Sequence, residues 1–345
     1  MIRAQPLRSL LLALFAAASA AALLAAGASA RPAHVQARVQ ATAKAAAPSL
    51  TFTVFAKTNQ HLDSIVWTGS QFLYVTNTKN TVWSAPATGS PLSTFAQMPD
   101  LVEETRCILS PGTHGFPAGV IFCHAPDNKI WEISGNGHSM HVFASLPTPY
   151  PPIADGALTF DSAGSFGYRL LAATGRSGTK TKGGAVFAIS SSGAVTKIGS
   201  YSGPGGADEV SLAPSSFGSA SNELLIAVDP GNSRSALLAM NAAGQTTTIA
   251  SFPTGINPIM TIPAAGAAPA GSPASGIYLT DDESYDVYFA PAGSLTSDDA
   301  GDVLVGAEVT SHFWVVSPKG TGFAVVAVPT TIPKPASYEQ AVFIG

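Results

Sequence analysis

The chain of 345 residues carries few charges, because Asp, Glu, Lys and Arg make up 11% of it, against about 25% in average soluble domains. Five of its 17 Lys and Arg precede Leu50, so the body that follows has 12 of them against all 21 Asp and Glu, a formal charge of −9. Binding to nucleic acid requires clustered Lys and Arg that displace counterions, and this acidic, charge-poor body therefore excludes nucleic acid as a partner.

The N-terminal residues 1–30 have the pattern of a signal peptide. Arg3 and Arg8 precede a long, mostly apolar run, and Ala28-Ser29-Ala30 supplies small residues at a cleavage site. We therefore expect a secreted or extracytoplasmic protein. The alternative is an uncleaved membrane anchor, since the apolar run approaches the ~20 residues that span a bilayer. Residues 31–49 are Ala-rich without strand or turn signals, which predicts a disordered tether.

Six apolar alternating runs recur along the rest of the chain at intervals of roughly 40 to 55 residues, the spacing of propeller and solenoid repeats. The first residues of these runs are Asp63, Glu104, Asp155, Asp208, Asn257 and Ser311. Within each unit, a continuous apolar run follows, then a run with a bulky pair such as Val82-Trp83. Continuous apolar runs are typical of strands buried on both faces, and we expect the bulky pairs to fill the gaps between sheets.

A fourth run closes every unit except the last, and a matching segment, FTVFAKT at residues 52–58, precedes the first complete unit. A ring whose last sheet takes its outer strand from the N-terminal end accounts for both facts and removes an open edge. The sequence therefore predicts an all-β domain over residues 50–345. It is a six-bladed β-propeller with four-stranded antiparallel blades, with 263–276 as a loop inside the fifth blade.

Cys107 and Cys123 are the two cysteines, and both fall in the second unit, on its first and second predicted strands. A hairpin with its tip near Gly115 places them opposite one another, and an exported protein favours a disulfide. The alternative is a pair of buried free thiols.

The starts of the first strands form a ring at the propeller axis, because these strands line it. Four of the six ring residues are acids, and carboxylates that meet at a narrow axis must protonate, shift apart or bind a cation. Calcium accepts many oxygen ligands in irregular geometry, so calcium is the expected ion. The alternative is that these residues only cap strand starts by accepting hydrogen bonds from free backbone amides.

The repeat resembles that of the six-bladed propellers of the NHL, SMP-30/gluconolactonase and strictosidine-synthase-like group, as in the segment IYLTDDESYDVYFAP at 277–291. The resemblance covers roughly residues 50–345. In the calcium-dependent lactonases of this group, side chains from successive inner strands hold the metal. Carried over by position, the resemblance implies four metal ligands in this chain, Glu104, Asp155, Asp208 and Asn257. It also implies a general base on a metal-bound water, Asp281 or Asp229. The first blade departs from the pattern, since it offers Asp63 rather than Glu.

Several other polar residues fall near the same predicted face. His124 is a third candidate catalytic residue, and the candidate ligand-binding residues are Asp63, Asn77, Arg106, His61 and His312. A histidine beside a carboxylate can act as acid, base or ligand near neutral pH, although a structural role is the commoner one. Arg106 either binds an anionic substrate group or neutralises Glu104.

These observations favour an exported, monomeric propeller with an axial divalent-cation site. It binds a small polar or ester-type molecule there, and hydrolysis of the calcium-dependent lactonase or esterase kind is the reaction we expect if it is an enzyme. The alternative is a non-catalytic propeller that recognises a protein or a cell-wall glycan. Apart from the N-terminal segment, nothing predicts contact with a membrane.

Overall fold

The computed structural model describes residues 49–76, 81–99, 105–147, 156–175, 183–203, 205–230, 234–264, 271–295, 297–333 and 337–345. By its internal contacts the chain divides into two units, Met1–Lys44 and Ala45–Gly345. All described residues belong to the second unit. The predicted signal peptide and almost all of the predicted tether therefore lie outside the described residues.

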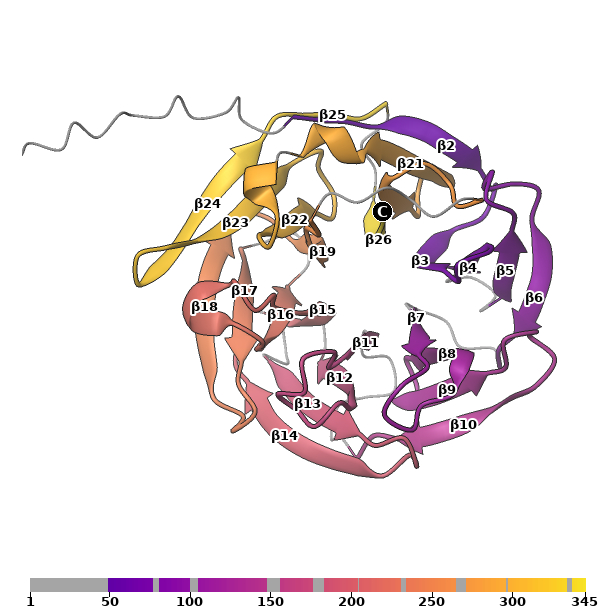
Figure 1. The fold of residues 1–345 in the computed structure, drawn as a ribbon, viewed down its shortest axis with the longest axis horizontal. Coiled ribbons are helices and arrows are strands. Elements are labelled where there is room, and N and C mark those ends of the chain that lie inside the picture. Colours follow the sequence, from indigo (N-terminus) through magenta and orange to yellow (C-terminus); the bar gives the residue numbers. More distant parts are fainter. Residues whose placement is uncertain are drawn as a thin grey trace, which may run out of the picture. The chain divides into compact units, whose positions relative to one another are not determined.

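The second unit is a six-bladed β-propeller (Figure 1), as predicted. Each blade is a four-stranded antiparallel sheet. From the axis outward, the blades are β3 (Leu62–Trp67), β4 (Phe72–Thr76), β5 (Thr81–Ala85) and β6 (Ser93–Gln97); β7 (Arg106–Pro111), β8 (Ala118–Ala125), β9 (Lys129–Ile133) and β10 (Met140–Ser145); β11 (Gly156–Phe160), β12 (Leu170–Gly175), β13 (Gly184–Ile189) and β14 (Val195–Tyr201); β15 (Gly206–Leu212), β16 (Leu224–Asp229), β17 (Ser235–Met240) and β18 (Thr246–Phe252); β19 (Ile256–Thr261), β22 (Val303–Ala307), β23 (Phe313–Lys319) and β24 (Gly322–Val328); and β26 (Tyr338–Ile344), β20 (Gly276–Asp281), β21 (Asp286–Pro291) and β2 (Thr53–Lys57).

The six inner strands contact one another in a closed circle, in the order β3, β7, β11, β15, β19 and β26. The second strands are buried on both faces, which explains their continuous apolar sequences, such as LLIAVD in β16. Apolar clusters fill the spaces between neighbouring sheets, and the bulky pairs of the third strands contribute to them. Phe187 of β13, for example, packs in one cluster and its neighbour Val186 in another.

The fifth and sixth blades differ from the prediction. The hairpin β20–β21, expected in the fifth blade, belongs to the sixth, and the strand that follows it in sequence, β22, returns to pair with β19. Stretch 263–276 therefore connects two blades instead of lying within one. The segment that begins at Ser311 leads into β23, the third strand of the fifth blade, so the prediction that Ser311 starts an inner strand is wrong. Both arrangements use apolar strands of the same length, and periodicity alone does not distinguish them.

The sixth blade closes the ring with both ends of the domain. Its innermost strand, β26, is the last strand of the chain and pairs with β20. Its outermost strand, β2, comes from the start of the domain and pairs with β21. A short parallel pair, β1 (Leu50–Thr51) with β25 (Thr330–Thr331), adds to this closure. The predicted outer strand at 52–58 is thus confirmed in its role.

The remaining described elements are short. The 3₁₀ helices are Gly218–Ala220, Ala292–Ser294 and Ser297–Asp299. Among the described residues, no helix is long and apolar enough to cross a membrane.

A disulfide joins Cys107 of β7 to Cys123 of β8, as predicted. The two residues are direct cross-strand partners, so the bond fixes the register between the innermost strand of the second blade and its neighbour. Neither cysteine is accessible for other chemistry, because both are buried.

We expect the double substitution Cys107→Ser, Cys123→Ser to lower the free energy of unfolding by about 3 kcal/mol, because the cross-link no longer restricts the unfolded chain. Equilibrium denaturation with and without reductant measures this. Reductant should destabilise the wild type and leave the double variant unchanged. Equal stability of oxidised wild type and double variant would contradict the expectation.

Candidate functional site

The inner strands begin with polar residues that meet at the axis. Five of the six inner strands have a buried polar side chain at or near their first residue. In the order β3, β7, β15, β19 and β26, these residues are Asp63, Arg106, Asp208, Asn257 and Glu339. The pairing of β3, β15 and β19 with their neighbours shifts register at this level, at Asp63, Asp208 and Asn257 respectively. Such irregularities re-aim side chains that would otherwise follow the alternation of the strand. We call these five residues the charged layer.

Arg106 is the centre of the charged layer and is 1% exposed. Its Nη2 donates a hydrogen bond to Oε2 of Glu339 at 3.0 Å and lies 3.5 Å from Oδ1 of Asp208. Its Nη1 donates to the backbone carbonyl oxygen of Asp63 at 2.6 Å. One guanidinium therefore joins the first, second, fourth and sixth blades across the axis. A buried guanidinium needs such partners, because an unpaired charge away from water is very unfavourable.

The amide of Asn257 completes this layer. Its Nδ2 donates to the same oxygen of Glu339 at 3.2 Å, while its Oδ1 is buried without a hydrogen-bond partner among the described residues. Asn257 adjoins Pro258, which has no N–H to offer the adjacent strand, in keeping with the irregular pairing at this point.

A second polar layer lies one residue further along the inner strands. Oε2 of Glu209 accepts a hydrogen bond from the backbone N–H of Ile259 at 2.9 Å, and the side chain of Gln340 hydrogen-bonds to Glu209. Burial raises the pKa of Glu209 to about 7, although the positive charge of Arg106 and these hydrogen bonds oppose the shift.

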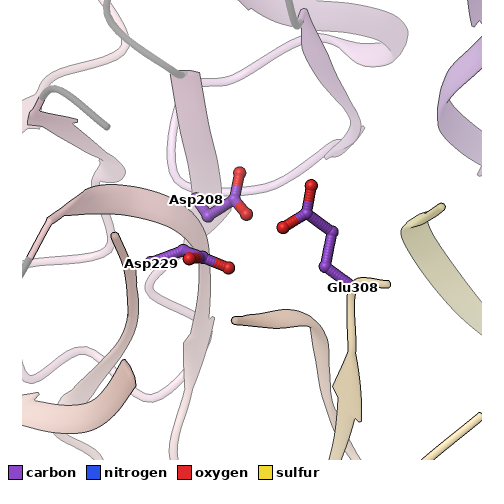
Figure 2. A group of neighbouring side chains, drawn as sticks. All are labelled: Asp208, Asp229 and Glu308. Atoms are coloured by element: carbon purple, nitrogen blue, oxygen red, sulfur yellow. The ribbon is translucent and has the colours of Figure 1, made fainter. Parts of the chain in front are cut away.

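Three carboxylates gather beside the charged layer. Asp208, Asp229 and Glu308 each offer an oxygen within 4.8 Å of those of the other two, and Figure 2 shows the three groups converging. They come from the start of β15, the end of β16 and the residue after β22, so the fourth and fifth blades build the cluster together. Asp208 and Asp229 are buried and Glu308 is partly exposed, which leaves the solvent side of the cluster at Glu308.

The cluster and the charged layer together are strongly acidic. Five described carboxylates belong to them (Asp63, Asp208, Asp229, Glu308 and Glu339), and Arg106 is their described basic residue. Carboxylates that lie this close together repel one another unless protons or cations balance their charges.

The structure brings together some of the predicted site residues. The charged layer contains four of them, namely Asp63, Arg106, Asp208 and Asn257. A fifth, Asp229, lies beside Asp208 in the three-carboxylate cluster. Arg106 does neutralise acids, but those that its contacts identify are Glu339 and Asp208. Glu104, Asp155 and Asn77 lie outside the described residues, and their proposed roles stay predictions.

Sequence reasoning missed Glu339 and Glu308. Glu339 takes the position in the sixth blade that was assigned to Ser311, because β26 and not the segment after Ser311 is the innermost strand. Glu308 follows β22, which was expected to be an outer strand and is the second strand of its blade. Both misses follow from the exchange of strands between the fifth and sixth blades.

His124 and Asp281 lie on second strands, as predicted, and both are buried. Burial lowers the pKa of His124 to about 4, and its Nδ1 lies 3.4 Å from the carbonyl oxygen of Ala157. Burial raises the pKa of Asp281 to about 6, while hydrogen bonds from the backbone N–H groups of Glu283 and Ser284 oppose the shift. Asp281 thus closes the turn between β20 and β21.

His61 and His312 occupy different surroundings. Nδ1 of His61 lies 3.1 Å from Oδ1 of Asp282, and its ring meets that of Tyr285 edge to face, so it links the first and sixth blades. His312 is exposed in the turn between β22 and β23, where its Nδ1 pairs with Oγ1 of Thr310. It does not start an inner strand.

No protein-family model and no curated protein matches the chain. Among solved structures, it is similar to the soluble aldose sugar dehydrogenase of Escherichia coli, with 10% identity, 85% of this chain and 99% of that chain covered, and a TM-score of 0.53. It is also similar to a chain of a nidogen/laminin complex, with 8% identity, 81% and 83% coverage and a TM-score of 0.50. At these identities the similarity shows the propeller fold alone. Membership of the NHL and SMP-30 group stays a prediction.

We expect Arg106→Met to lower the free energy of unfolding by about 3 to 5 kcal/mol, because Glu339 and Asp208 then stay buried without their common partner. Arg234→Met, which replaces an exposed arginine, serves as the control and should change stability by less than about 0.5 kcal/mol. Chemical denaturation measures both. Similar losses for the two variants would show that Arg106 does not hold the charged layer together.

Asp281 should make stability depend on pH. Its folded pKa of about 6 exceeds the ordinary value of 3.8, so the folded state binds more protons between these values and loses stability as pH rises through the window. Relative to Asp281→Asn, the wild type should lose on the order of 2 kcal/mol between pH 4 and pH 7. Denaturation curves at several pH values check this, with Asp298→Asn, an exposed site, as the control. A constant difference between wild type and Asp281→Asn across this range would refute the assignment.

Proposed function

We propose that this propeller binds a divalent cation, calcium in particular, at Asp208, Asp229 and Glu308. The cation and the acidic face around it then bind a small, oxygen-rich molecule. The observation that carries the proposal is the convergence of three carboxylates within 4.8 Å. The burial of Asp208 and Asp229 beside a partly exposed Glu308 supports it, because a divalent cation would favour three carboxylates held this close together.

The donor set fits calcium. All three groups offer hard carboxylate oxygens, and calcium takes six to eight such ligands, including amide oxygens and water, in irregular geometry. Asn257 offers a further oxygen, since its buried Oδ1 has no hydrogen-bond partner among the described residues and β19 pairs with β22, the strand that ends just before Glu308. Zinc would prefer histidine or cysteine, and the cluster contains neither.

The chain's own residues then have separate tasks. Arg106 contacts Asp208 and Glu339, and its contact with Asp208 orients one of the three carboxylates of the cluster. Glu308, the partly exposed member, lies where a ligand would approach. Bound calcium would supply an electrophilic centre that attracts carbonyl, carboxylate or hydroxyl oxygens of that ligand.

Hydrolysis of an ester or lactone stays a second candidate, and it needs a general base beside the cation. Burial raises the pKa of Asp281 to about 6, which suits proton transfer near neutral pH, but the side chain is buried and accepts hydrogen bonds from backbone N–H groups that include those of Glu283 and Ser284. Asp229 belongs to the cation cluster in our proposal, and His124 is buried with a lowered pKa. The arrangement therefore supports binding better than catalysis. A panel of lactones and esters, assayed with and without calcium, tests for turnover.

Calcium should stabilise the chelator-treated protein. At a concentration of about 100 times Kd, the expected gain is about 2.7 kcal/mol, or a rise in Tm of several °C. Asp229→Asn and Glu308→Gln should each abolish most of this rise, because each removes one of three charged ligands. Thermal unfolding with a calcium titration measures the effect.

The matched control is Glu283→Gln, which removes an exposed carboxylate near Asp281 and should retain the full calcium response. If calcium leaves Tm unchanged in the wild type, the cation site is refuted. A non-catalytic propeller that recognises a protein or glycan without metal would then be the better account.

A further inference from the structure

A separate cavity lies on the axis beyond the charged layer. Residues of all six inner strands line it, and its volume is about 260 Å³. The charged layer separates it from the strand-start face, because Arg106, Asp63 and Asn257 are at most 1% exposed. The cavity follows the inner strands toward their C-terminal ends. It therefore lies on the other side of the charged layer from the cluster's solvent side.

The cavity combines one buried acid with hydroxyl and aliphatic groups. Glu209 and Gln340 lie at the end next to the charged layer, and Thr159, Ser211 and Thr261 contribute hydroxyls further along the strands. Ile108, Leu158 and Ile259 are among the aliphatic lining residues. The described lining contains no lysine, arginine or histidine, so the cavity favours a ligand with positive charge and some apolar surface.

Glu209 is the group that specifies this ligand. It is 6% exposed, and its Oε2 accepts one hydrogen bond from the backbone N–H of Ile259. Nearby, Oε1 of Gln340 accepts hydrogen bonds from Ser64 and from the backbone N–H of Ile65, which orients the amide. A buried carboxylate is costly unless positive charge lies near it. The charge of Arg106 acts on Glu209, but this guanidinium hydrogen-bonds to Glu339 and lies beside Asp208, so it balances three acids at once.

We propose that this cavity binds a small primary amine as its ammonium ion. The ammonium group donates charge-assisted hydrogen bonds to Glu209, and the hydrocarbon part occupies the space between the inner strands. Such hydrogen bonds are roughly twice as strong as neutral ones, so they favour an amine over an alcohol of the same shape. The site does not depend on the divalent cation, because its ligand contacts a different set of residues.

The size of the cavity limits the ligand. A water molecule takes about 30 Å³ of the liquid, so the space holds several waters or one small organic molecule. It is slightly smaller than the ~300 to 1,000 Å³ of pockets that hold drug-sized ligands. A short alkylamine fits this range, whereas an oligosaccharide does not.

The test is calorimetric titration of the full chain with n-butylammonium, n-butanol and butyrate at pH 8, with chelator present. At this pH the amine is protonated, since alkylamines of the lysine type have a pKa near ~10.4. We expect n-butylammonium to bind at least tenfold more tightly than n-butanol, and butyrate not to bind. Binding in chelator, without calcium, distinguishes this site from the cation cluster.

Two variants locate the ligand. Glu209→Gln keeps the size of the side chain and should weaken binding of n-butylammonium at least tenfold. Ser211→Phe retains the acid but fills the cavity and should abolish binding. Glu223→Gln, on the same blade outside the cavity lining, is the control and should bind as the wild type does. Equal affinity for amine and alcohol, no binding of the amine, or unchanged binding in either cavity variant would overturn the proposal.

Discussion

The arrangement of this propeller's axis depends on one buried guanidinium among acids. Arg106 hydrogen-bonds to Glu339 and to the backbone of Asp63 and lies beside Asp208, so one side chain ties four of the six blades at their centre. Sheets that meet only through apolar packing need no such residue. Here the inner strands bring polar groups together, and their charges must be balanced where water is scarce. Arg106 supplies part of that balance, because it pairs with Glu339 and lies beside Asp208.

The same side chain divides the axis into two environments. On one side, Asp208 faces Asp229 and partly exposed Glu308, which gives a group of oxygen donors near solvent. On the other side, Glu209 and Gln340 end a cavity that runs between the inner strands. Adjacent residues of β15, Asp208 and Glu209, thus contribute to two different sites. A register shift at Asp208 accompanies this change of direction.

Much of this fold was predictable from the sequence, and the reasons are local. Continuous apolar runs such as LLIAVD identify second strands, and the unpaired segment at 52–58 indicates how the ring closes. The position of Cys107 opposite Cys123 follows from hairpin geometry. The exchange of β20–β21 into the sixth blade was not predictable, because it depends on long-range pairing between strands with equivalent patterns. Glu339 and Glu308 were missed for this reason, whereas Asp63, Asp208 and Asn257 precede runs whose inner position is correct.

The central claim of our proposal is that Asp208, Asp229 and Glu308 together bind a divalent cation. The most direct measurement is a crystal structure of the protein grown with manganese in place of calcium, with anomalous scattering recorded at a wavelength where manganese contributes. Our account predicts an anomalous peak between Asp208, Asp229 and Glu308, with carboxylate oxygens as its ligands. Absence of a peak there at saturating manganese, with the three side chains directed apart, would contradict it.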